Sequence, residues 1–141
     1  MIRTELTELP DRWILPLRGD KLVKIDLNEN VMLTLDSQIR IILGYGAFLT
    51  LGSFWAQKEN RFRINELNQD QLDQILGSTV VSAVGFKNGA FRIVFDTGWQ
   101  FNVRASDESV PAAVIAGDTA MWVRTRPTDA VSERPDPSDD R

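Results

Sequence analysis

The fold is decided by two similar stretches that lie sixty residues apart: VMLTLDSQIRI at residues 31–41 and FRIVFDTGWQF at residues 91–101. In both, apolar and polar residues alternate, which is typical of strands with one buried face. The alternation is interrupted by Asp36-Ser37 in the first stretch and by Asp96-Thr97 in the second. Asp and Ser at such places favour tight turns, where the Asp side chain bonds the backbone. Each stretch therefore predicts two antiparallel strands joined by a three-residue loop.

A third strand is expected before each stretch. Ile25 and Leu27 match Val84 and Phe86 at a spacing of fifty-nine residues. Asn88-Gly89 is typical of a two-residue type I′ hairpin turn, which places Phe86 opposite Phe91 and Val84 opposite Ile93. The sequence thus predicts two copies of a three-stranded meander, at about residues 19–44 and 77–104.

Each predicted meander has one strongly apolar face, and such a face must be buried. We therefore predict an α+β fold that is mainly antiparallel β, with the two faces packed as a sandwich or as a partial barrel. The first face is expected to hold Val23, Ile25, Leu27, Val31, Leu33, Leu35, Ile39, Ile41 and Leu43. The second is expected to hold Val84, Phe86, Phe91, Ile93, Phe95, Trp99, Phe101 and Val103.

One helix is predicted between the units, at about 69–76. Asn68 and Gln71 suit a capping box, and Gly77 suits the residue after the C-terminus. Further strands are expected at Trp13–Leu17, Ala47–Phe54, Arg61–Ile64 and Ala120–Arg124, whereas Val110–Ala116 could be a strand or a helical turn. Pro16 inside a strand indicates an edge position.

The folded domain is expected to span residues 1–125. Residues 126–141, RPTDAVSERPDPSDDR, are rich in proline and charge and contain little that could be buried. We expect a disordered, solubilising tail, the alternative being a peptide that folds on a partner.

Composition removes several classes of function. The 141 residues include no histidine and no cysteine, so Ser-His-Asp and Cys-His nucleophiles and typical zinc sites are excluded. We therefore expect no enzyme, no metal and no cofactor. The net charge is −4, and the sixteen lysines and arginines are scattered, so no nucleic-acid partner is expected. The longest apolar stretch, around Ile41–Leu51, is too short to cross a bilayer, and a cytoplasmic protein is expected.

Three residues are candidates for a binding surface. Arg18 could bind an anion, although an internal carboxylate partner is favoured. Tyr45 lies between Gly44 and Gly46, which favour a bend but could also admit a ligand. Trp55 precedes a polar run and is the tryptophan most suited to exposure. Asp36 and Asp96 could form an acid–base pair, but their place at turns favours a structural role.

Several short motifs resemble a family of small, uncharacterised bacterial proteins, found mainly in actinobacteria. They are LPLRG at 15–19, the second meander ending in FDTG at 95–98, and AMW at 120–122. The resemblance covers about Trp13–Val123 and implies no activity, cofactor or catalytic residue.

Three functional classes remain open. The first is a non-enzymatic binding or interaction protein, with a protein partner or a second copy of itself. The second is an immunity protein that neutralises a bacterial toxin. The third is a small-molecule binder or a carboxylate-based enzyme with a pocket between the two units.

Overall fold

The computed structural model describes residues 5–52, 60–107 and 109–124. The first half contains β1 (Thr7–Glu8), β2 (Arg12–Ile14), β3 (Leu22–Leu27), β4 (Val31–Leu35), β5 (Ile39–Leu43), β6 (Phe48–Leu51) and β7 (Arg61–Arg63). A 3-10 helix (Ile64–Glu66) and helix α1 (Gln69–Asp73) follow. The second half contains β8 (Val80–Phe86), β9 (Phe91–Phe95), β10 (Trp99–Val103), β11 (Ala112–Ala116) and β12 (Thr119–Val123). The α+β expectation is confirmed.

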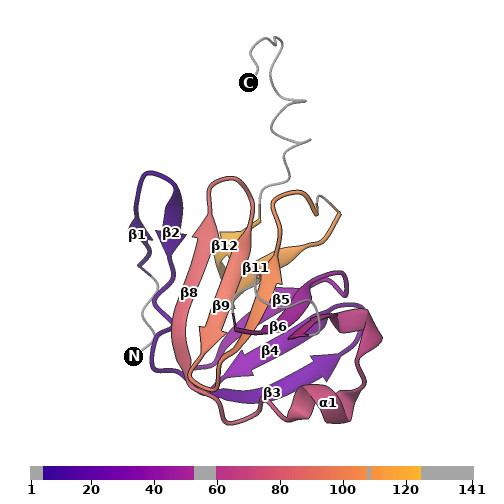
Figure 1. Ribbon diagram of the computed structural model, residues 1–141. Helices are drawn as coiled ribbons and strands as arrows, with labels where there is room; N and C mark the ends of the chain where they lie inside the picture. Colours follow the sequence, from indigo (N-terminus) through magenta and orange to yellow (C-terminus); the bar gives the residue numbers. More distant parts are fainter. Residues whose placement is uncertain (1–4, 53–59, 108, 125–141) are drawn as a thin grey trace.

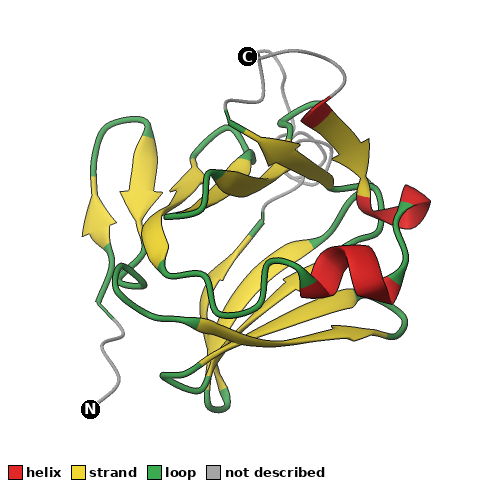
Figure 2. Cartoon of the chain, turned by 60° about the horizontal axis from the view of Figure 1, so that its bottom comes forward, coloured by secondary structure: helices red, strands yellow, loops and turns green. Residues whose placement is uncertain are grey.

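The strands form two antiparallel sheets that pack as an open sandwich (Figure 1). One sheet has seven strands in the order β1-β2-β8-β9-β10-β6-β7, and the other has five in the order β12-β11-β5-β4-β3. The two predicted meanders, β3-β4-β5 and β8-β9-β10, belong to different sheets. Figure 2 shows the two layers of strands with the helix at one side.

The two halves exchange elements. Strand β6, which follows the first meander, pairs with β10 of the second, and β11, which follows the second meander, pairs with β5 of the first. The segments before the meanders are exchanged as well. β2 pairs with β8, and Gln69 at the start of α1 donates a hydrogen bond to the Ile25 carbonyl of β3 over 3.1 Å. Each sheet is therefore completed by the other half of the chain.

The two meanders meet where β3 and β8 begin. Lys21 and Thr79 form an antiparallel bridge between them. Asp36 accepts a hydrogen bond from the Lys21 amide, and Asp96 accepts one from the Thr79 amide, both over 3.0 Å. The structural role predicted for these aspartates is confirmed, since each carboxylate binds the backbone next to the bridge.

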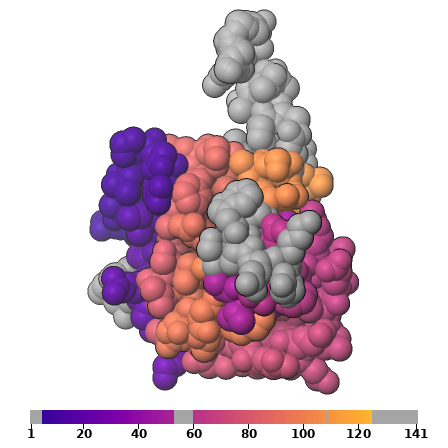
Figure 3. All heavy atoms as spheres, in the orientation of Figure 1, coloured from indigo at the N-terminus to yellow at the C-terminus, as the bar shows by residue number. Residues whose placement is uncertain are grey.

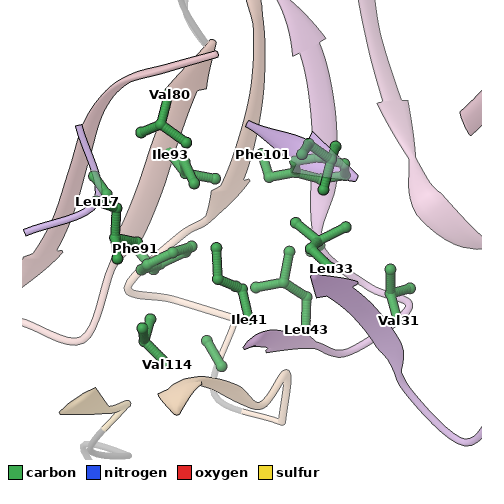
Figure 4. Packing of buried hydrophobic residues seen from close by; sticks show 14 of the residues in the cluster. Leu17, Val31, Leu33, Ile41, Leu43, Val80, Phe91, Ile93, Phe101 and Val114 are labelled. Carbon is green, nitrogen blue, oxygen red and sulfur yellow. The ribbon is translucent and has the colours of Figure 1, made fainter. Parts of the chain in front are cut away.

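The core lies between the sheets. Phe91, Ile93 and Phe101 of the second meander face Leu33, Ile41 and other residues of the first (Figure 4), and all five side chains are almost fully buried. Full burial of a side chain of this size contributes about 1.5–3 kcal/mol. Val110–Ala116, left open by the sequence, contains the core strand β11.

The predicted register of the β8–β9 hairpin is wrong by one residue. Gly85, not Phe86, lies opposite Phe91, and Ala83 lies opposite Ile93. The loop contains three residues because Phe86 pairs with Ala90, its amide donating to the Ala90 carbonyl over 2.8 Å. Within this loop, Gly89 is the one residue with a positive φ, +101°. Val84 and Phe86 therefore point away from the five-stranded sheet. The residues equivalent to Ile25 and Leu27 are Ala83 and Gly85, fifty-eight residues further along the chain.

Val23 was expected in the core but is 52% exposed. A bulge between Leu22 and Lys24 shifts the alternation, so that Leu22 and Ile25 face inward. The second meander has the equivalent bulge between Val80 and Ser82. Bulges of this kind place one extra residue on a strand and change the face of what precedes it.

Several predicted boundaries also change. The strand expected at Trp13–Leu17 ends at Ile14, and Pro16 lies in the following turn. The inference of an edge position is wrong, because β2 lies between β1 and β8. Helix α1 ends at Asp73, although its capping box at Asn68 is confirmed. The tail predicted at 126–141 lies outside the described residues.

Candidate functional site

The structure does not bring the predicted site residues together. Arg18 is exposed in the turn before β3, and no hydrogen bond or ion pair holds it within the described part of the chain. Tyr45 is half-buried, and its hydroxyl donates to the Asn28 carbonyl over 2.6 Å, at the other end of β3. A six-residue strand spans about 20 Å, so these residues lie far apart. Trp55 lies outside the described residues.

A different set of residues gathers on the outer face of the seven-stranded sheet. Direct cross-strand partners share one face of a sheet. The register therefore places Ile14, Val84, Arg92, Asn102, Phe48 and Arg63 in one continuous row across six strands. Arg12 and Arg61 lie two residues from members of this row and share its face, and Arg104 follows β10.

We call this surface the Arg–Phe face: Arg12, Arg61, Arg63, Arg92 and Arg104 with Phe48 and Phe86. It holds five of the twelve arginines of the chain. In the surface view, the N-terminal strands lie directly beside the β8 region (Figure 3). The register of β2 and β8 places Arg12 opposite Phe86. The expectation that basic residues are scattered holds for the sequence but not for the fold.

Each phenylalanine of the face carries two guanidinium groups. The Cζ atoms of Arg12 and Arg92 lie 4.8 and 5.4 Å from the Phe86 ring centroid. Those of Arg63 and Arg104 lie 4.2 and 5.0 Å from the Phe48 centroid. Cation–π contacts at these distances stabilise by about 0.5–1 kcal/mol at exposed sites, and they hold the side chains flat against the sheet.

Within the described structure, Arg12 and Arg104 of the face bind carboxylates. Arg12 and Asp11 form a two-bond ion pair of 2.9 and 3.0 Å, and the hydrogen bonds from Arg12 lower the pKa of Asp11. Arg104 binds Asp107 in the same way, over 2.9 and 3.1 Å. Burial alone would raise the pKa of Asp107, but the hydrogen bonds and the positive charge of Arg104 outweigh burial, and the pKa is lowered.

Arg92 differs from the other arginines. It lies on β9, the central strand of the seven. Its Nε atom is buried and has no hydrogen-bond partner within the described structure. A buried donor left without an acceptor costs about 1–3 kcal/mol, and more when the group is charged. The centre of the face therefore holds a half-buried cation whose Nε lacks an acceptor in the described ranges, and an anion bound to its guanidinium group would stabilise this charge.

The sequence contains a signal for this face. Arg61, Arg63 and Arg92 occupy the polar positions of alternating strands, where side chains point away from the core. Which arginines become neighbours depends on the strand order, and the exchanged pairing of β6 with β10 could not be derived from the local pattern.

The described structure also contains two small hollows, one of which borders the Arg–Phe face at Phe86. One, of about 110 Å³, is lined by Trp13, Phe86, Lys87, Gly89 and Trp122. The other, of about 140 Å³, is lined by Leu49, Phe62, Leu67, Gln71, Gln74 and Trp99. Neither is lined by Arg18 or Tyr45, and both are much smaller than the 300–1,000 Å³ of a typical small-molecule site.

Among the described residues, no group of three or more Asp and Glu side chains is placed to hold a metal ion. Within the same ranges, no helix has the length and hydrophobicity that crossing a membrane requires.

Comparison with known proteins identifies a family whose function is unknown. One family model, described as a family of unknown function (DUF6188), matches residues 13–131. Neither the curated proteins nor the solved structures contain a match to the chain.

Proposed function

Because this chain belongs to DUF6188, a family of unknown function, no activity comes with its family, and we propose from its geometry that it is a non-enzymatic binding protein. The Arg–Phe face is its binding surface. The observation that carries this proposal is the half-buried Arg92, whose Nε has no acceptor within the described structure, at the centre of a face with four further arginines.

The chemistry of the chain supports binding rather than catalysis. Without histidine and cysteine, an active site would rest on carboxylates, lysine or tyrosine. Asp36 and Asp96 are engaged with backbone amides, and the Tyr45 hydroxyl is engaged with a backbone carbonyl. Arginine and aromatic residues, by contrast, are the types that are enriched where proteins bind one another.

The proposal also includes location and origin. We propose that this is a bacterial protein of the cytoplasm. The absence of cysteine supports this location, because proteins of a reducing compartment do not depend on disulfides for stability.

The proposal is tested by titrating isotope-labelled protein with acetate and with inorganic phosphate, while NMR follows the arginine Nε–H and backbone amide signals. We expect the Arg92 Nε–H signal and the amides of β8, β9, β10 and β6 to shift first. Phosphate should shift them more than acetate, because arginine binds it through two parallel hydrogen bonds and it carries more charge.

Shifts of equal size at Arg18, Lys24 and Arg40, which lie away from this face, would mean that the anions bind without preference. In that case the Arg–Phe face is not a binding surface, and the proposed function fails.

A further inference from the structure

We infer that the partner of the Arg–Phe face is an acidic segment of another protein, whose Asp or Glu side chains pair with the arginines that contact Phe48 and Phe86. This inference rests on the proposed function and names the partner class for the same surface.

The charge of the face carries the first step. Five cationic side chains share the face. Arg12 and Arg104 form ion pairs with Asp11 and Asp107, whereas the buried Nε of Arg92 has no acceptor within the described structure. The whole chain nevertheless carries a net charge of −4. The molecule is therefore polarised, and a partner needs negative charge where it touches this face.

The geometry of the arginines carries the second step. Cross-strand neighbours lie about 4.8 Å apart, so Arg92 on β9 and Arg63 on β7 lie three strands, or about 14 Å, from one another. In an extended peptide, residues two apart point to the same side about 7 Å apart. If acidic residues occupy alternating positions of an extended segment, each one lies about 14 Å from the next but one. This distance matches the spacing of Arg92 and Arg63.

The phenylalanines favour a protein over a nucleic acid. Single-stranded nucleic acids bind by stacking bases on open aromatic faces, along a groove that is positive overall. Here both rings already contact guanidinium groups. The net negative charge of the chain would also repel an extended phosphate backbone outside the face. A short acidic segment avoids both difficulties, because its charge is confined to the contact.

The test is fluorescence anisotropy with the full chain and three labelled probes: a peptide of alternating Glu and Leu, the same peptide with Gln for Glu, and single-stranded oligo(U). The wild-type protein is expected to bind the Glu–Leu peptide about tenfold more tightly than the Gln–Leu peptide, because charge-assisted hydrogen bonds are about twice as strong as neutral ones. Added salt should weaken this preference.

The variant Arg63→Gln/Arg92→Gln is expected to lose about tenfold or more in affinity for the Glu–Leu peptide, as residues at the centre of an interface do. The matched control is Lys24→Gln/Arg40→Gln. It removes the same charge from the outer face of the five-stranded sheet, where the register joins both residues through Thr34. The control should bind within about twofold of wild type, since it lies outside the interface. Arg92→Lys, which keeps the charge but loses the planar fork, should fall between them.

The outcomes separate the two claims. If oligo(U) binds more tightly than the Glu–Leu peptide and Arg63→Gln/Arg92→Gln abolishes its binding, the partner is a nucleic acid, which overturns the inference but leaves the binding face intact. If the peptide binds equally well to both double variants, the inference is also wrong. If no probe binds and the anion titration shows no preference, the proposed function itself fails.

Discussion

At Gly85 the two sheets approach each other closely. A Cβ atom at this position would lie 2.4 Å from Cε2 of Trp122, which reaches over from β12 of the other sheet. Trp122 also stacks on Phe91, with the ring centroids 5.3 Å apart. The equivalent position in the first meander is Leu27, opposite Val31. The larger aromatic pair in the second half therefore requires the smaller residue beside it.

Gly85→Ala is expected to lower the free energy of unfolding by about 1–3 kcal/mol, because the added methyl group overpacks a rigid ring contact. Urea unfolding followed by tryptophan fluorescence measures the change. In a Trp122→Leu background the same substitution should cost less, since the clashing ring is gone. Val81→Ala on the same strand serves as the control, because Val81 is exposed. An equal cost in both backgrounds would contradict the assigned contact.

Asp107 predicts a dependence of stability on pH. Its folded-state pKa lies below the ordinary value of 3.8, so the carboxylate form is stabilised by folding. Its contribution is fully present above about pH 3.8 and is lost as the pH falls through the lower, folded-state pKa. Asp107→Asn should therefore destabilise by about 1 kcal/mol near neutral pH, and the difference from wild type should shrink below pH 3.8. Urea unfolding across this range checks it, and a constant difference would contradict the assignment.

At the scale of the hairpin, the two meanders form the same turn with different residue types. The loops at 36–38 and 96–98 are equivalent, and their last residues are Gln38 and Gly98. Both adopt a left-handed backbone, with φ values of +78° and +94°. Gln38 is the one non-glycine residue with a positive φ in the described part of the chain. A side chain in this conformation costs roughly 1–2 kcal/mol.

Gln38→Gly is expected to raise the free energy of unfolding by about 0.5–1 kcal/mol, since relief of the strain exceeds the added freedom of the unfolded chain. The reverse change, Gly98→Gln, should lower it. Chemical denaturation of the two variants tests both signs. Gln100→Gly, a strand position, is the control and should destabilise. Loss of stability in Gln38→Gly would show that the Gln38 side chain makes a contact worth more than the strain.

Turn chemistry explains which strands could be predicted. Asp36 and Asp96 begin loops whose length agrees with the sequence, and their carboxylates bind the backbone amides of Lys21 and Thr79 just before the neighbouring strand. The turn predicted at Asn88-Gly89 is wrong because these two residues are compatible with two different loops. The type I′ turn needs a positive φ at both, whereas the structure uses it at Gly89 alone and lets the Asn88 side chain accept from the Ala90 amide over 3.0 Å. The bulge before Ser82 then restores Val80 to the core, and neither adjustment has a local signature.

At the scale of the molecule, Arg124 joins segments that are distant in sequence. Its guanidinium is buried and donates to the carbonyls of Gly89, Val110, Arg104 and Ala105 over 2.6–3.0 Å. These carbonyls belong to the β8–β9 loop and to the long connection between β10 and β11. A single planar group with five donors can satisfy all four, and a lysine ammonium cannot.

Arg124→Lys and Arg124→Met are therefore each expected to lower the free energy of unfolding by at least about 2 kcal/mol, because buried carbonyls lose their donors. The control is Arg40→Met, which removes a half-buried arginine that donates to one carbonyl, that of Gly117. Thermal and urea unfolding measure both. A cost as small as that of the control would mean that the carbonyls find other donors.

The sequence predicted the class of fold, the duplication and the structural role of the paired aspartates, because each follows from local spacing. It did not predict the Arg–Phe face. Arg12, Arg92 and Arg63 lie on β2, β9 and β7, and only the exchange of strands between the halves places them in one sheet. The local pattern also did not show that Arg18 and Tyr45 lie far apart, at opposite ends of β3.

The exchange of strands also means that the chain can be cut between its two halves while the strands stay paired. The connection at residues 74–76 contributes no strand to either sheet, so a chain cut there keeps every pairing between β6 and β10 and between β5 and β11. Two separately produced fragments would then behave as halves of a split reporter, each offering the other an unfilled sheet edge. The same complementarity would let two intact molecules trade halves at high concentration, as domain-swapped proteins do.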